Sequence, residues 1–140
     1  AGNANHFDAE LFHPPYLFKG PRPSISKAPG TVNYGEVFFI GTGTADPTTI
    51  KRVTWIRLGS VTHAFDSNQR FNELAFVPTT GGLSVTAPAN RNLAPPGHYM
   101  LFILNGNGVP SVASTASAVM ATQRTPSTSR KVAAVFSGSL

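Results

Sequence analysis

Residues 95–104 read Pro-Pro-Gly-His-Tyr-Met-Leu-Phe-Ile-Leu. Two prolines and a glycine are typical of a turn, and the apolar run after them is typical of a β-strand. Side chains of an extended segment alternate between two faces, and in this run both faces carry apolar residues. We therefore expect a strand over 98–104 that is buried on both faces.

The rest of the chain continues this pattern of short apolar runs separated by turns. The 140 residues include 13 glycines and 12 prolines, which disfavour long helices. Leu83 and Val85 are expected to face the core, with Ser84 and Thr86 on the other side. About seven short strands favour a β-sandwich, and a closed barrel is the alternative. Besides 98–104, the expected strands are 36–40, 50–58, 73–77, 83–87 and 112–120.

The two ends of the chain differ from this middle part. Residues 1–30 contain a proline or glycine every few positions, so we expect an irregular lead-in that packs on the domain or on a preceding one. Residues 31–120 are predicted to form the sandwich. Residues 121–140 are rich in Thr, Ser and Arg and are expected to be a linker or frayed tail.

Charge and hydropathy exclude two classes of partner. The formal net charge is +5, but the basic residues are spread out and form no dense stripe, so no nucleic-acid binding is expected. No apolar run is long enough to span a membrane, and the first residues lack the layout of a signal peptide.

The chain has no obvious catalytic or metal motif of its own. The turn at 41–47 contains Gly-Thr-Gly, but a proline follows it instead of a helix, so it is no dinucleotide fingerprint. The histidines are His6, His13, His63 and His98, and no two stand at ligand spacing. A metal site built wholly within this chain is not expected.

Four segments, taken in order, resemble the C-terminal domain of galactose oxidase and glyoxal oxidase, which are copper-radical oxidases. The resemblance covers about 8–114. Each segment alone is weak, whereas four in the same order are specific. They are Glu-Leu-Phe-His-Pro-Pro-Tyr-Leu at 10–17 with Arg-Pro at 22–23, Leu-Gly-Ser-Val-Thr-His-Ala-Phe-Asp-Ser-Asn-Gln-Arg at 58–70, Ala-Pro-Pro-Gly-His-Tyr-Met-Leu-Phe at 94–102, and Asn-Gly-Val-Pro-Ser-Val-Ala-Ser at 107–114.

This resemblance implies an immunoglobulin-like early-set β-sandwich that caps a preceding seven-bladed β-propeller. In the family, a loop from this domain enters the propeller and its tip histidine binds copper. On this sequence that residue is His63. Thr62 before it, and Asn68, Gln69 and Arg70 after it, would orient the loop through hydrogen bonds. An imidazole nitrogen suits copper.

The resemblance also implies what the chain lacks. The family oxidises an alcohol or aldehyde with O₂ to give H₂O₂, using copper and a tyrosine joined to a cysteine. This chain has no cysteine and no Tyr-His pair, so we expect no catalytic residue within it and no activity when it is alone. The remaining copper ligands would come from the propeller. A secreted or cell-surface parent protein is implied as well.

Two other functions stay open at this point. The same sandwich can serve as a carbohydrate- or cell-surface-binding module without copper, or as a structural spacer, because fold alone does not determine function. A sugar-binding module needs exposed aromatic rings. Trp55 stands in the middle of an apolar strand, so we expect it in the core rather than in a sugar-stacking platform.

Overall fold

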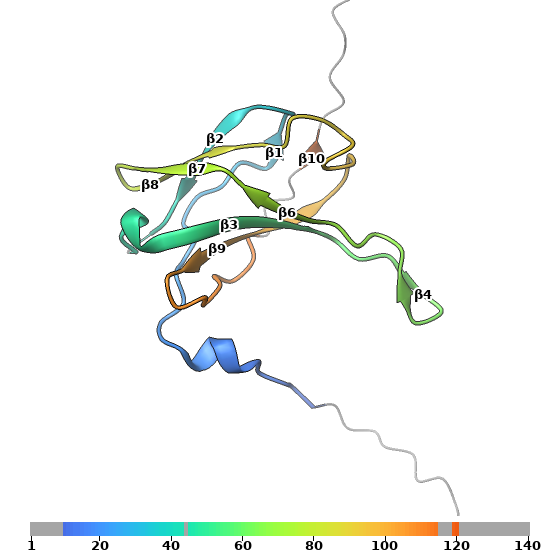
Figure 1. The fold of residues 1–140 in the computed structure, drawn as a ribbon, viewed down its shortest axis with the longest axis horizontal. Helices are drawn as coiled ribbons and strands as arrows, with labels where there is room; N and C mark the ends of the chain where they lie inside the picture. The colour runs from blue at the N-terminus through green and yellow to red at the C-terminus, as the bar shows by residue number, and fades with distance from the viewer. Residues whose placement is uncertain (1–9, 44, 115–118, 121–140) are drawn as a thin grey trace, which may run out of the picture.

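The computed structural model describes residues 10–43, 45–114 and 119–120 of the chain. They form two three-stranded antiparallel sheets in two layers (Figure 1). The predicted all-β sandwich is confirmed, with open sheets instead of a closed barrel. One sheet has the order β2 (Val37–Gly41), β8 (Gly82–Thr86) and β7 (Phe76–Thr79). The other has the order β6 (Phe71–Leu74), β3 (Ile50–Arg57) and β9 (Tyr99–Asn105).

Several shorter elements complete the described part of the chain. β1 (Thr31–Val32) pairs in parallel with β10 (Val119–Met120). β4 (Val61–Thr62) and β5 (Phe65–Asp66) form a separate hairpin. Two 3-10 turns, η1 (Pro15–Phe18) and η2 (Pro47–Thr49), begin with a proline, whose fixed φ favours the first position of a helical turn. The described residues include no helix long and apolar enough to cross a membrane.

The core lies between the two sheets and is built on Trp55, which is fully buried, as its place in an apolar strand predicts. Its ring stacks on Phe38 of the opposite sheet, with centroids 5.7 Å apart, and is tilted against Tyr99 at 5.6 Å. Leu83 and Val85 are also fully buried, whereas Thr86 is exposed, which confirms the alternation predicted for this strand. The apolar inner faces of both sheets therefore hold the layers together.

The β9 strand is buried on one face only, so the prediction of burial on both faces is wrong. Tyr99, Leu101 and Ile103 face the core, whereas Met100 and Phe102 stay partly exposed on the outer face of the sheet. On that outer face, Phe102 lines a shallow pocket together with Tyr16 and Pro110, so the face is only partly covered. A sandwich has one interior, so one face of each strand is left outside it.

Two of the expected strands also differ from the structure. The run at 73–77 is divided: Leu74 pairs with Val53 in one sheet, and Phe76 pairs with Val85 in the other. The chain changes sheets at Ala75, whose carbonyl accepts a hydrogen bond from Thr86. The run at 112–120 is not one strand, since only Val119–Met120 is a strand and 115–118 lie outside the described residues.

Part of the lead-in is bound along the sandwich. The Arg22 guanidinium donates to the carbonyls of Pro110 and Ser111, at 2.9 and 2.8 Å. The Asn105 side chain donates to the carbonyl of Pro21 at 3.2 Å. These bonds attach the lead-in to the segment that follows β9. Residues 1–9 and the predicted tail at 121–140 lie outside the described residues.

Candidate functional site

The β4–β5 hairpin projects from the sandwich between β3 and β6. β3 ends at Arg57 and β6 begins at Phe71, and the chain between them does not return directly. Instead Val61 pairs with Asp66 and Thr62 with Phe65, which makes a narrow antiparallel ribbon. Figure 1 shows this ribbon, labelled β4, extending beyond the end of both sheets. Its tip is distant from the core.

A two-residue turn, His63-Ala64, forms the tip of the hairpin. Both residues have positive φ, 52° for His63 and 61° for Ala64. Such a left-handed pair matches the twist of a tight hairpin, but Asn-Gly is the usual sequence for it. Placing L-residues there costs roughly 1 to 2 kcal/mol per residue. Strained turns of this kind cluster at functional sites, where a particular side chain must occupy the position.

The His63 ring has one nitrogen engaged within the hairpin. Thr62 Oγ1 lies 2.7 Å from His63 Nδ1, and the His63 side chain is exposed to solvent. In the tautomer protonated on Nδ1, the ring donates to the threonine hydroxyl, and the lone pair of Nε2 is free. In that tautomer, the exposed ring offers Nε2 as a metal-binding nitrogen.

Asp66 organises the base of the hairpin. Its Oδ1 accepts hydrogen bonds from the backbone N–H of Ser60 and of Asn68, each at 2.9 Å. These two bonds hold the pKa of the Asp66 carboxyl below its usual range. A Cβ on Gly59 would lie 3.0 Å from Asp66 Oδ2, so glycine permits this close approach. The sequence analysis did not single out Asp66, although Asp-Ser-Asn is typical of an Asx turn.

The residues predicted to orient His63 have different positions. Thr62 contacts the His63 ring directly. Asn68 contributes its backbone N–H to Asp66, and Arg70 contributes its carbonyl to the N–H of Arg57 at 3.0 Å. Within the described part of the chain, Asn68, Gln69 and Arg70 make no hydrogen bond to His63. The structure therefore brings Thr62, but not the other three, to the histidine.

The flanks of the hairpin expose large apolar side chains. Val61 is 73% exposed and Phe65 is 64% exposed, and Leu58 and Phe71 at the base are 46% and 55% exposed. Exposed apolar residues gathered on one projection are typical of a surface that another protein surface covers. The hairpin therefore carries apolar surface that lies outside the core of the sandwich.

The described residues do not assemble a metal site of their own. They include no group of three or more His, Cys, Asp or Glu side chains that could hold a metal ion. His13 packs edge-on against Phe18, and His98 is exposed just before β9. His63 fits copper as one imidazole ligand, because its exposed ring keeps one nitrogen unused. The remaining ligands would have to come from residues outside this described set.

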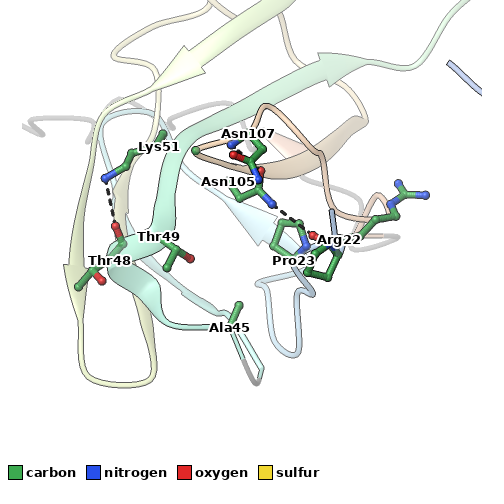
Figure 2. Close-up of a pocket in the computed structure, with 10 residues that line it drawn as sticks. Arg22, Pro23, Ala45, Thr48, Thr49, Lys51, Asn105 and Asn107 are labelled. Atoms are coloured by element: carbon green, nitrogen blue, oxygen red, sulfur yellow. Dashed lines mark hydrogen bonds between the residues drawn. The ribbon is translucent and has the colours of Figure 1, made fainter. Parts of the chain in front are cut away.

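A separate cavity of about 710 Å³ lies at the other end of β3, near its first residues (Figure 2). Its polar groups already bind one another: Lys51 Nζ donates to the Thr48 carbonyl at 3.3 Å, and Asn105 binds the Pro21 carbonyl. The cavity thus lies between the lead-in and the sandwich, and we assign it no ligand.

Two packed antiparallel sheets are typical of immunoglobulin-like domains, and the family model adds that the predicted early-set class is right. The chain belongs to the galactose oxidase-like early set domain family, whose model matches residues 22–118. Galactose oxidase of Gibberella zeae is 36% identical over 118 residues, which cover 79% of this chain and 17% of that protein. Aldehyde oxidase GLOX of Vitis pseudoreticulata is 36% identical over 114 residues, covering 74% of this chain and 22% of that protein.

A solved structure agrees with these sequence relatives. It is a fungal alcohol oxidase in complex with copper, and it superposes with a TM-score of 0.68 at 29% identity. The match covers 76% of this chain and 24% of the oxidase. The chain therefore spans less than a quarter of the length of the relatives it matches.

Proposed function

We propose that this domain is the C-terminal part of a copper-radical oxidase, in which it caps a preceding β-propeller and its β4–β5 hairpin carries His63 to the copper ion. The observation that carries the proposal is the place of His63 on a strained two-residue turn, exposed, with Nδ1 bound to Thr62. That arrangement presents one imidazole nitrogen at the far end of an insertion element.

The domain's own residues would have a limited part in the chemistry. Thr62 and the tight turn orient the His63 ring, and Asp66 holds the two legs of the hairpin together at its base. Copper, when bound, supplies the redox centre for oxidising a primary alcohol or an aldehyde with O₂ to give H₂O₂. With no cysteine in its sequence, this chain contributes no tyrosine-cysteine cofactor. We include a secreted or cell-surface parent protein in the proposal, on the family resemblance.

The test is a His63→Ala substitution in the full-length parent protein, with copper content and substrate turnover measured. We expect turnover to be abolished and copper content to fall, while the domain folds normally, because an exposed side chain contributes little buried apolar area. His98→Ala is the matched control, since it removes another exposed imidazole and should leave both quantities unchanged. Normal copper and turnover in His63→Ala would refute the ligand assignment.

A further inference from the structure

Two arginines flank the hairpin where it leaves the sandwich. β3 pairs antiparallel with both β6 and β9, so the end of β3 lies beside the start of the other two strands. Arg57 is the last residue of β3, and Arg70 immediately precedes β6. The backbone N–H of Arg57 donates to the carbonyl of Arg70 at 3.0 Å. The segment that carries the hairpin therefore begins after Arg57 and ends at Arg70, and these two cationic residues are neighbours.

A third arginine reaches the same end of the domain from the loop at 88–97. The loop is attached there by two hydrogen bonds: Asn72 donates to the Leu93 carbonyl at 3.0 Å, and Arg57 Nη2 donates to the Pro96 carbonyl at 3.1 Å. Arg91 is exposed on this loop. We call Arg57, Arg70 and Arg91 the arginine collar.

Two tyrosine hydroxyls hold the same loop and interact with the charges of the collar arginines. The Tyr34 hydroxyl donates to the Ala94 carbonyl at 2.8 Å, and the Tyr99 hydroxyl donates to the neighbouring Pro95 carbonyl at 2.6 Å. Burial raises the pKa of both hydroxyls. The charges of Arg91 and Arg57 oppose that rise in the pKa at Tyr34, and the charges of Arg57 and Arg70 oppose it at Tyr99.

No carboxylate neutralises the collar within the described residues, where the one ion pair joins Arg52 to Glu73. The other carboxylates between β1 and β6 are engaged locally. Glu36 binds Asn33, Asp46 binds Thr48, and Asp66 binds Ser60 and Asn68. The collar thus places three cations at the base of the hairpin, two of them exposed and Arg57 half-buried against the Pro96 carbonyl.

We propose that the arginine collar docks on a carboxylate-rich surface of the domain that receives the β4–β5 hairpin. The inference rests on the proposed function, because it takes the insertion of the hairpin as given. Complementary charges at the edge of a protein interface guide two domains together and disfavour incorrect relative orientations. The exposed apolar flanks of the hairpin continue into the collar, and the relatives are more than four times as long as the matched segment, so a receiving domain has room upstream.

The experiment compares two variants of the full-length protein that change the net charge equally. Arg70→Glu/Arg91→Glu reverses two collar charges, and Lys27→Glu/Lys51→Glu reverses two exposed charges away from the collar. Docking is measured by protease cleavage between the domains and by whether thermal unfolding shows one transition or two. We expect the collar variant to be cleaved roughly tenfold faster and to unfold in two transitions, with the control variant unchanged.

Salt and a milder substitution give a second measurement. Collar docking in the unmodified protein should weaken between about 20 and 500 mM NaCl, because salt screens exposed charges. The Arg70→Gln/Arg91→Gln variant should show an intermediate cleavage rate and less salt dependence. The proposal is overturned if the collar and control variants behave alike. It is also overturned if the collar variant loses binding to heparin, used as the polyanion probe, while its domains stay docked.

The inference and the proposed function fail separately. If His63→Ala keeps its copper while the collar variant undocks, the ligand assignment fails and the collar inference stands. If His63→Ala loses copper while the collar variant stays docked, the collar inference fails and the ligand assignment stands.

Discussion

Thr62 Oγ1 lies 2.7 Å from His63 Nδ1, and this contact joins the threonine that precedes the turn to the residue at its tip. Because the contact engages Nδ1, Nε2 is the ring nitrogen without a hydrogen bond in the described structure. Partners that orient a metal-binding histidine typically contribute 10- to 100-fold to metal affinity. The Thr62–His63 pair therefore links the local geometry of the hairpin to the proposed copper site.

Thr62→Val should weaken copper binding by the full-length protein roughly tenfold, because the methyl group that replaces the hydroxyl cannot accept from or donate to the ring. Folding stability should change by less than about 0.5 kcal/mol, since the residue is exposed. Copper titration measures the first quantity and chemical denaturation the second. Thr62→Ser, which keeps the hydroxyl, should restore affinity, and equal affinities for the two variants would contradict the positioning role.

Ala64→Gly should stabilise the hairpin. Ala64 has a φ of 61°, a conformation that glycine adopts without steric cost. Glycine also adds entropy to the unfolded chain, so the net gain is expected to be about 0.5 to 1 kcal/mol. Denaturant unfolding and amide exchange in the turn measure the gain. Ala89→Gly is the control: Ala89 is exposed but lacks a positive φ, and its replacement should stabilise nothing.

The base of the hairpin should loosen in acid. Backbone hydrogen bonds from Ser60 and Asn68 lower the pKa of Asp66 in the folded state, so the ionised carboxylate is the stabilising form. Its contribution is fully present above the unfolded pKa, near 3.8, and is lost as pH falls through the lower folded value. The amide chemical shifts of Ser60 and Asn68 should follow this titration. Asp66→Asn should remove the pH dependence.

The isolated domain should fold without metal and have no oxidase activity. The described residues hold no cluster of metal-binding side chains, and the stability comes from buried strand faces. EDTA should therefore leave the melting temperature unchanged, and a fall of more than a few degrees would reveal a structural metal. Copper-loaded domain should release no H₂O₂ from galactose, glyoxal or methylglyoxal, because the chain has no cysteine.

The alternation of apolar and polar residues predicted which side chains of a strand are buried, but it did not predict which strands pair with one another. Leu83 and Val85 alternate with Ser84 and Thr86 in the sequence, and the same alternation sets their burial. The run at 73–77 carries no signal for its division, because Leu74 and Phe76 are both apolar. Their assignment to different sheets depends on pairing with Val53 and Val85, which are distant in the sequence.

The copper-ligand role of His63 stays a prediction. The resemblance to the oxidase family selected His63 and the adjacent Thr62, whose hydroxyl lies 2.7 Å from the His63 ring nitrogen Nδ1. The resemblance did not select Asp66. Its role depends on the folded hairpin, in which the backbone N–H groups of Ser60 and Asn68 donate to the same carboxylate oxygen. Asn68, Gln69 and Arg70, which the resemblance did select, make no hydrogen bond to the histidine in the described structure.

By itself, the sequence determined an all-β domain, because frequent Gly and Pro residues and alternating apolar runs allow little besides short strands. The choice of open sheets over a closed barrel depended on strand pairing. The sequence also determined that this chain cannot form a tyrosine-cysteine cofactor, since it has no cysteine. Only the tertiary structure decided that His63 stands on a left-handed turn, because φ angles follow from the pairing of β4 with β5. The arginine collar was likewise decided by tertiary structure, since antiparallel pairing brings Arg57 and Arg70 together and hydrogen bonds hold the loop of Arg91 beside them.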